Sequence, residues 1–580
     1  MSEQITITHE RTDDIPVIIA FLLKMRVAAL IDKHFPTNGN WTGLSLGQML
    51  VVWLTFIISE GDHRLYHVEP WVAAHQHTIS RSLHQEVLPR DCTDDRLGTG
   101  LDYLCVAENW AECECALNQT LIRVYDLPPQ TIRVDPTTVS AYVPPAGMFQ
   151  LGHSKDHRPD LPQLKIALAT LDPLGLPMTI ATVAGNTADD PLYLPAIAKV
   201  RRSVGLAGMT YIGDCKIAAL ATRADIVAHH DFYLCPLSAK QVSAEELDRL
   251  LEPIWSSEQP LEEGRLTAEG QAEAQAEPDA VGFAYAVEQV GHGQSGQPQR
   301  WQERRVVVRS LAHARLQEES LRQRAQRAVD EINALNERKQ GKKRLAAEAE
   351  ALKAVEAIIA RNRVVDIVQI GVHAIVHEET KRRYGQRPAQ TLRTMSMQVE
   401  ARIDQAAMAQ GIRRLGWRVY ATNHDQELSL KQVVAAYWSE YLVEQGIRRL
   451  KGHSLSLTPL YLKCEQRIVG LIFLLSIALR VLVLMQFVAR ENLQRAGTML
   501  KGIYPGQPGR QTTRPTTEMM LHVFRGITLS RITVDGETYE HLTPLTPVQE
   551  RIVELIGIPL ETFSRLAPQL SKTAFHSHEP

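Results

Sequence analysis

The segment LKIALATLDPLGLPMTIATV, residues 164–183, decides the fold class of this chain. Two apolar runs, 164–171 and 176–183, flank the turn sequence DPLG. Apolar runs of this length around a turn that contains Pro and Gly predict a β-hairpin. A shorter run at 131–135 precedes the hairpin and predicts one further strand, which ends at Asp135.

Helices and strands alternate after the hairpin. The residue patterns predict a helix at 191–204, a strand at 209–213, a helix at 217–229 and a strand at 232–235. Asn186 and Asp189, in the preceding sequence AGNTADD, are expected to cap the first of these helices. Alternation of this kind predicts a mixed α/β sheet domain.

The alternation stops between residues 237 and 415. This stretch contains the low-complexity acidic sequence AEGQAEAQAEPDAVG, strand-like segments at 283–290 and 304–308, and a tract at 311–362 that is rich in Ala, Glu, Arg and Lys. The tract predicts an extended or paired helix without a strict heptad repeat. A strand at 417–422 and a helix capped by Ser429 then resume the earlier alternation. We therefore interpret 237–415 as an insertion into the sheet domain.

The first 125 residues carry apolar runs at 15–23 and 44–59 and predict an N-terminal helical domain. Asp94 and Asp95 within it are interpreted as helix-capping residues rather than catalytic ones. The predicted organisation is the helical domain at 1–125, the first part of the sheet domain at 126–236, the insertion at 237–415, the second part of the sheet domain at 416–500 and a C-terminal tail region at 501–580.

Composition limits the class of protein. The chain has 580 residues, of which 44% are hydrophobic and 22% charged, and a formal net charge of −3. These values predict a folded soluble protein of several domains. The net charge argues mildly against a nucleic-acid partner, but Arg and Lys gather locally at 300–309, 322–327, 338–344, 361–363, 381–387 and 413–418. Such local basic surfaces are compatible with DNA binding.

Two features predict a cytoplasmic protein. The seven cysteines are odd in number and scattered, unlike a disulfide framework, and the first residues, MSEQITITHERTDD, are polar rather than signal-like. The apolar stretch 468–488 is long enough to span a membrane but contains Arg480 and Gln486. We interpret it as a buried core helix and expect no membrane partner.

Three acidic residues stand where phosphoryl-transfer chemistry would need them. Two-metal phosphoryl transfer requires carboxylates from separate chain segments that converge on one point. Asp135 and Asp214 each end a predicted strand, and Glu444 lies on the helix after the last strand. The helical repeat places Tyr437, Glu440, Glu444, Arg448 and Lys451 on one face of that helix. Taken alone, this face is also typical of a solvated charged stripe on an amphipathic helix.

One charged loop offers a second candidate. His153, Asp156, His157 and Asp160 in GHSKDHRPD could form a metal cluster. A loop rich in charge and Pro more often shapes a turn or touches DNA, and that is the reading we favour.

Several of these motifs together resemble a known family. The blocks GHSKDHRPDLPQLKIALATLDPLGLP (152–177), AGNTADD and GWRVYATN, with the tail sequences RPTTEMMLHVF and LTPLTPVQERIVELIGI, resemble insertion-sequence transposases of the DDE class across nearly the whole chain. The YREK signature of that group, Y-x2-R-x3-E-x6-K, is met here by Tyr437, Glu444 and Lys451 at the correct spacing. Its arginine position holds Glu440, which departs from the pattern.

The resemblance implies a fold and an assignment of roles. It implies a ribonuclease H-like catalytic domain interrupted by a long insertion, in line with the 230 residues that separate Asp214 from Glu444. It also implies that Asp135, Asp214 and Glu444 are the catalytic residues and the ligands of two Mg²⁺ or Mn²⁺ ions.

The resemblance further implies DNA contacts. Tyr437 and Lys451 would hold the phosphates of the element end, with Arg448 on the same stripe compensating for Glu440. Glu440 itself would repel a phosphate, since it cannot make the bidentate contact of an arginine. The implied partners are double-stranded DNA, as element ends and target, and a second copy of the chain in the complex that holds two ends together.

We therefore expect a DNA transposase that cuts at the terminal inverted repeats of an insertion sequence and joins the ends to target DNA, in the bacterial cytoplasm near the nucleoid. The main alternative is a catalytically degenerate relative that binds DNA without cutting it, with Glu440 as the first sign of decay. A coiled-coil interaction protein built around 311–362 is a weaker alternative, because it leaves the two strand-ending aspartates unexplained.

Overall fold

The structure is a computed structural model, and it describes residues 5–266, 277–294, 296–337, 345–381, 390–424, 428–460, 462–534 and 537–567. Most of the low-complexity acidic sequence and the basic runs 338–344 and 382–387 lie outside the described residues. The chain divides into two compact units, 1–235 with 289–301 and 437–580 (unit 1), and 236–288 with 302–436 (unit 2). This division puts the end of the second unit at 436, beyond the predicted end of the insertion at 415.

The N-terminal part of unit 1 is helical, as the sequence predicted. Its helices are α1 (Ile15–Lys24), α2 (Val27–His34), α3 (Leu46–Glu60), α4 (Val68–Ala74), α5 (Gln76–Leu83), α6 (Asp94–Leu104) and α7 (Ala107–Val124), with short 3₁₀ turns η1 (Leu65–His67) and η2 (Pro89–Cys92). The helix α3 begins with a capping box, in which Ser45 accepts from the backbone of Gln48 and the Gln48 side chain accepts from Ser45. Twelve of its fifteen residues are buried, so it is a core helix.

A three-stranded sheet connects the two ends of the chain, and the sequence did not predict it. Strand β1 (Ile5–Arg11) pairs antiparallel with β15 (Thr528–Val534), which pairs with β16 (Glu537–Leu542). The described part of the C-terminal region, which ends at residue 567, also contains β13 (Leu500–Lys501), β14 (Gln511–Thr512), α17 (Thr517–His522), α18 (Pro547–Leu555) and α19 (Glu561–Ser564).

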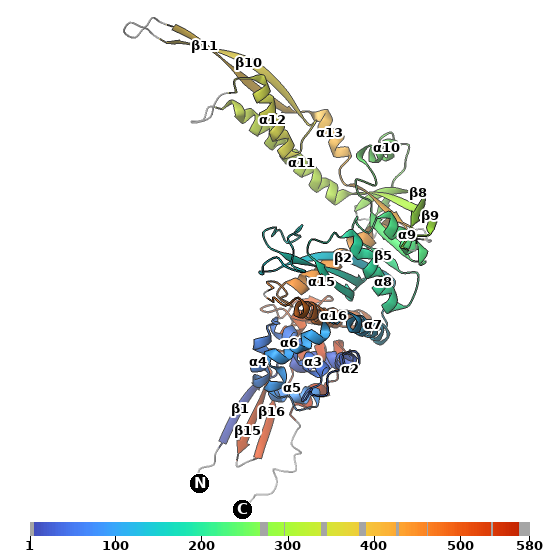
Figure 1. Ribbon diagram of the computed structural model, residues 1–580, viewed down its shortest axis with the longest axis vertical. Helices are drawn as coiled ribbons and strands as arrows, with labels where there is room; N and C mark the ends of the chain where they lie inside the picture. Colours follow the sequence, from blue (N-terminus) through green and yellow to red (C-terminus); the bar gives the residue numbers. More distant parts are fainter. Residues whose placement is uncertain are drawn as a thin grey trace, which may run out of the picture. The chain divides into compact units, whose positions relative to one another are not determined.

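The sheet of unit 1 has the predicted mixed α/β character (Figure 1). Its strands are β2 (Thr131–Ser140), β3 (Gln163–Leu171), β4 (Leu176–Ala184), β5 (Thr210–Ile212) and β6 (Phe232–Pro236), in the order β4-β3-β2-β5-β6. The predicted hairpin is confirmed as the antiparallel pair β3 and β4. Strand β2 runs antiparallel to β3 and parallel to β5, which is parallel to β6. Between these strands lie η3 (Asp190–Leu192), α8 (Tyr193–Val204) and α9 (Leu220–Ala228).

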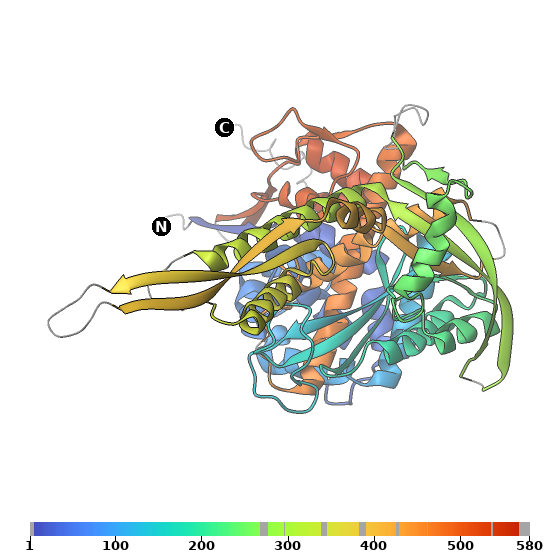
Figure 2. The same cartoon turned by 90° about the horizontal axis from the view of Figure 1, so that it is seen from above.

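The predicted core helix is α16 (Glu465–Ala496), which contacts α3 and α6 as well as β4 (Figures 1 and 2). It is long and apolar enough to cross a membrane, but its most apolar window is 94% buried within the protein. The fully buried guanidinium of Arg480 lies 2.9 Å from the Glu114 carboxylate on α7 and also donates to Ser476. A buried charge of this kind is tolerated only when it is paired.

Unit 2 contains α10 (Ala244–Trp255), α11 (Leu311–Asn333), η5 (Ala334–Asn336), α12 (Glu348–Asn362) and α13 (Gln405–Arg413), with strands β7 (Glu262–Gly264), β8 (Ala280–His292), β9 (Pro298–Ser310), β10 (Val368–Lys381), β11 (Gln390–Ile403) and β12 (Trp417–Thr422). The hairpin end of β8 and β9, 289–301, belongs to unit 1. The predicted helical tract is thus a pair of helices, which packs against the β10–β11 ribbon around Ala325, Val355 and Val399 (Figure 1).

The last two helices that concern the site are α14 (Leu430–Trp438) and α15 (Tyr441–Lys451). Ser429 accepts from the backbone N–H of Gln432, as its predicted capping role requires. The sequence predicted one continuous helix here, but the helix is interrupted at Ser439 and Glu440. The single face proposed for residues 437–451 is therefore divided between two helices.

Candidate carboxylate site

Strand pairing brings Asp135 and Asp214 to the same level of the unit 1 sheet. In the parallel pair, Arg133 lies opposite Ile212, and each aspartate follows two residues later. Because parallel strands advance by the same rise per residue, the two carboxylates emerge side by side. Strand β2 continues to Ser140, so Asp135 lies within the strand and not at its end as predicted.

The two aspartates line a shallow pocket of about 270 Å³. Its walls come from three segments of unit 1 that are far apart in sequence: Arg133, Val134 and Asp135; Ile212, Gly213 and Asp214; and Tyr437, Glu440 and Val443. Three carboxylates therefore face one small space, and a phenol is present with them.

Asp135 is electrostatically strained. Burial raises the pKa of Asp135 to about 6, and its side chain is only 28% exposed. The nearby Lys155 ammonium lowers the pKa. The carboxylates of Asp214, Glu440 and Asp189 each raise it further. Like charges held this close favour binding of a cation, because a cation relieves their repulsion.

Asp214 is held in place by two donors. The hydroxyl of the buried Tyr193 donates to Asp214 Oδ1 at 2.6 Å, and the backbone N–H of Lys216 donates to the same oxygen at 2.8 Å. Burial and the Asp214 charge raise the pKa of Tyr193, so its hydroxyl remains a donor. This arrangement fixes one carboxylate oxygen of Asp214.

Sequence reasoning gave no role to Lys155 in the GHSKDHRPD loop. Its ammonium lies 3.8 Å from Asp135 Oδ1 and 3.6 Å from Asp189 Oδ2, and it donates to the carbonyl of Pro136. Asp189 occupies the residue before η3 but makes no side-chain cap there; it accepts from Lys165 at 2.6 Å. The predicted capping role of Asp189 is therefore replaced by an ion pair next to the site. The only sequence feature that could have indicated these contacts is the high density of charged residues in GHSKDHRPD and AGNTADD.

The residues of the YREK-like helix divide between two places. Tyr437 and Glu440 line the pocket. Glu444 is exposed on α15 and is not among the residues that line it. Arg448 is exposed on the last turn of α15, and the Lys451 ammonium lies 2.8 Å from Asp156 Oδ1. Glu440, which the sequence marked only as a departure, is thus the acidic residue of this segment that faces the two aspartates.

The second metal-cluster candidate does not assemble. Asp156 pairs with Lys451, and Asp160 accepts two hydrogen bonds from Arg158, at 2.9 and 2.7 Å. Within the part of the chain that the structure describes, no three His, Cys, Asp or Glu side chains already stand as a set of metal ligands. Asp135, Asp214 and Glu440 nevertheless supply carboxylate oxygens, the donors that Mg²⁺ and Mn²⁺ prefer. The donor types fit such an ion, although their side chains do not yet form a ligand set.

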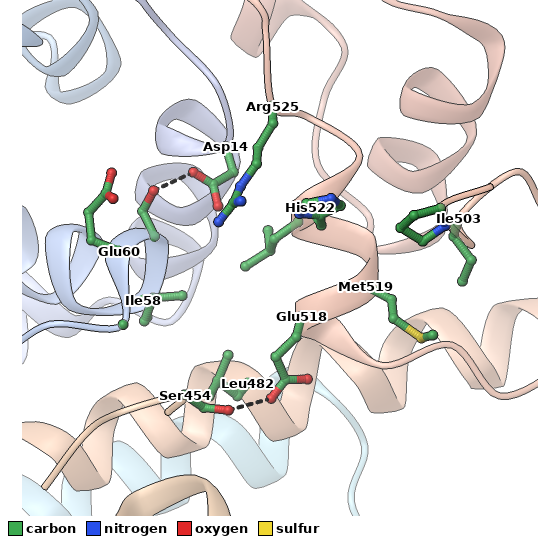
Figure 3. A pocket seen from close by; sticks show the side chains of 14 residues that line it. Asp14, Ile58, Glu60, Ser454, Leu482, Ile503, Glu518, Met519, His522 and Arg525 are labelled. Carbon is green, nitrogen blue, oxygen red and sulfur yellow. Dashed lines mark hydrogen bonds between the residues drawn. The ribbon is translucent and has the colours of Figure 1, made fainter. Parts of the chain in front are cut away.

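A larger pocket of about 1050 Å³ also lies in unit 1 (Figure 3). Asp14, Glu60 and Glu518 line it together with His522 and Arg525. Asp14 accepts from Ser59 at 2.6 Å, and Glu518 accepts from Ser454 at 3.1 Å (Figure 3). Glu60 and Glu518 stand on helices, whereas Asp135 and Asp214 emerge side by side from parallel strands, so the smaller pocket is the candidate for metal-dependent chemistry.

Comparison with known proteins adds little. No protein-family model matches the chain, and no curated protein sequence matches it. A solved structure with some likeness is a cryo-EM structure of the piggyBac transposase synaptic complex with hairpin DNA, at 7% sequence identity and a TM-score of 0.33, covering 96% of this chain and 83% of that chain. Likeness at this level does not establish a common fold, so the functional argument depends on the residues of the site.

Proposed function

We propose that this chain is a DNA transposase that cuts at the terminal inverted repeats of an insertion sequence and joins the ends to target DNA. The observation that carries the proposal is the pocket where Asp135, Asp214 and Glu440 meet from three distant segments. The motifs that resemble DDE insertion-sequence transposases support it independently. The unit 1 sheet, with its first strand in the middle, is compatible with the ribonuclease H-like fold that the resemblance implies.

Asp135 and Asp214 would hold divalent cations against the scissile phosphate. Bound Mg²⁺ or Mn²⁺, two ions in the full site, would supply an activated water and stabilise the leaving oxygen. The residues of the chain do the rest. Tyr193 fixes the direction of the Asp214 carboxylate through its 2.6 Å hydrogen bond. Burial raises the pKa of Asp135, and the neighbouring carboxylates of Asp214 and Glu440 raise it further.

Two residues are candidates for the third carboxylate, Glu440 in the turn between α14 and α15 and Glu444 on α15. The signature spacing assigns this role to Glu444, whereas the pocket is lined by Glu440. The two residues are one helical turn apart, with the Glu444 backbone N–H donating to the Glu440 carbonyl at 3.3 Å. A continuous helix through Ser439 would change which of the two faces the aspartates, so the assignment is a question for substitution.

Double-stranded DNA is the proposed partner. Tyr437 in the pocket, with Arg448 and Lys451 on α15, would contact phosphates of the element end. The Lys451 ammonium would exchange its Asp156 partner for a phosphate. We further propose a homodimer that holds two ends together and a location in the bacterial cytoplasm at the nucleoid.

The test is metal-dependent cleavage. Duplexes carrying the inverted repeats that flank the gene would be incubated with the purified full-length chain and Mg²⁺ or Mn²⁺. We expect strand cleavage that Asp135→Asn and Asp214→Asn each abolish. Asp190→Asn is the matched control, because Asp190 is an exposed acid next to the site that pairs only with Lys216 in the described structure. Cleavage by the Asp135 and Asp214 variants at the wild-type rate would overturn the proposal.

The same assay assigns the third ligand. If Glu440 is the ligand, Glu440→Gln abolishes cleavage and Glu444→Gln leaves it; if the signature spacing holds, the opposite result is seen. Binding of the repeats without cleavage under any divalent cation would favour the degenerate, DNA-binding relative over the enzyme.

A further inference from the structure

Lys155 occupies a constrained position beside the carboxylate pocket. It lies in the loop between β2 and β3, and its backbone N–H donates to the Thr138 hydroxyl at 3.0 Å. Its ammonium donates to the Pro136 carbonyl. The next residue, Asp156, pairs with Lys451 at 2.8 Å. The backbone hydrogen bond and the neighbouring ion pair fix the position of the Lys155 backbone, so its ammonium lies within reach of the pocket.

The ammonium bridges two acids that would otherwise repel each other. It lies 3.8 Å from Asp135 and 3.6 Å from Asp189. Asp189 also has its own buried cation, Lys165, at 2.6 Å. The ion pair of Asp135 seen among the described residues is the one with Lys155, and the carboxylates of Asp214 and Glu440 line the same pocket. Lys155 is therefore the cation on which the charge balance of Asp135 depends.

An ammonium ion and a divalent cation compete for the same carboxylate. Both are attracted to the Asp135 oxygen, and a divalent ion bound there would repel an ammonium about 4 Å away. The Lys155 side chain is one-third exposed and unbranched, so it can swing towards solvent without disturbing the core.

We infer that Lys155 is the exchangeable resident cation of the carboxylate pocket: it neutralises Asp135 while no divalent ion is bound and gives way when one binds. The inference rests on the proposed function, because it concerns the same metal-binding carboxylates. Its consequence is that the wild-type chain binds divalent ions more weakly than its carboxylates alone would allow. In exchange, the pocket keeps its shape when no ion is present.

Mn²⁺ binding tests the inference. Mn²⁺ would be titrated into the full-length chain, stripped with EDTA and dialysed, and followed by calorimetry at pH 7.5. We expect Lys155→Met to bind Mn²⁺ about tenfold or more tightly than wild type, because methionine removes the ammonium that competes with the ion for Asp135. Lys155→Arg keeps the charge and should restore wild-type affinity. The matched control Lys33→Met removes an exposed ammonium on α2, outside the carboxylate pocket, and should leave the affinity unchanged.

A second readout separates this role from DNA binding. In EDTA at pH 8, Lys155→Met should also lower the thermal unfolding midpoint, whereas Lys155→Arg should not. Unchanged Mn²⁺ affinity in Lys155→Met, together with weaker binding of duplex DNA, would overturn the inference and make Lys155 a phosphate contact. If that result is seen but wild type binds Mn²⁺ and Asp135→Asn does not, the proposed function still stands. Wild-type protein without any Mn²⁺ binding that depends on Asp135 would overturn both.

Discussion

Replacing Asp135 with Asn should stabilise the metal-free protein. Asp135 is buried against three other carboxylates, and its pKa is raised from 3.8 to about 6. A rise of about two pKa units means that the ionised form costs up to about 3 kcal/mol in the folded state. Asparagine keeps the shape of the side chain and removes the charge, so this cost disappears.

The effect has a defined pH dependence. A carboxyl group whose folded pKa lies above its unfolded value favours folding when it is protonated, so the cost is absent below about pH 3.8, grows as pH rises, and is complete above about pH 6. Asp135→Asn should therefore unfold at a higher temperature than wild type in EDTA at pH 8, and at the same temperature near pH 4. Added Mn²⁺ should reverse the order at pH 8, because only wild type gains from the bound ion.

The assay is thermal unfolding followed by far-UV circular dichroism, with Asp190→Asn as the control, since that residue is exposed and should show no such gain. A variant less stable than wild type at pH 8 in EDTA would refute the reasoning, because Asp135 would then be stabilised by its partners and not strained by them.

Three further predictions follow from contacts in unit 1. Tyr193→Phe removes the 2.6 Å hydrogen bond to Asp214 and should slow DNA cleavage about 10- to 100-fold in single-turnover assays without changing DNA affinity; an unchanged rate would remove Tyr193 from the site. Arg480→Met leaves the buried Glu114 carboxylate unpaired and should cost about 3–5 kcal/mol in urea unfolding, whereas Arg480→Met combined with Glu114→Leu should recover most of it; equal losses in both would show that the charge pair is not the cause. Burial raises the pKa of Asp14 to about 6, so wild type should lose thermal stability as the pH rises from about 4 to about 6, and Asp14→Asn should reduce this loss. An unchanged loss in the variant would contradict the raised pKa of Asp14.

Local patterns explain how much of the fold could be predicted. The hairpin at 163–184 and the N-terminal helices follow from apolar periodicity and turn residues, which act within a few positions. The pairing of β1 with β15 joins residues more than 500 positions apart, and no local pattern specifies such a partner. The interruption of the helix at Ser439 and Glu440 was also missed, because neither residue is a strong helix breaker.

In the candidate site, too, the residues set by local patterns could be predicted and those set by long-range contacts could not. Asp135 and Asp214 could be named because each falls near the end of an apolar run in parallel strands. Glu440 and Lys155 could not, because their places depend on where a helix breaks and on how a charged loop folds back across the sheet. The ion pair between Lys451 and Asp156 could not be predicted either, because the two residues are 295 positions apart in the sequence.

The most direct measurement is the position of Mn²⁺ in crystals of the full-length chain, located by its anomalous scattering. The account predicts an ion about 2 Å from carboxylate oxygens of both Asp135 and Asp214, with the Lys155 ammonium displaced from its present position 3.8 Å from Asp135. Mn²⁺ bound only elsewhere, with the two aspartates left without an ion at saturating concentration, would contradict it.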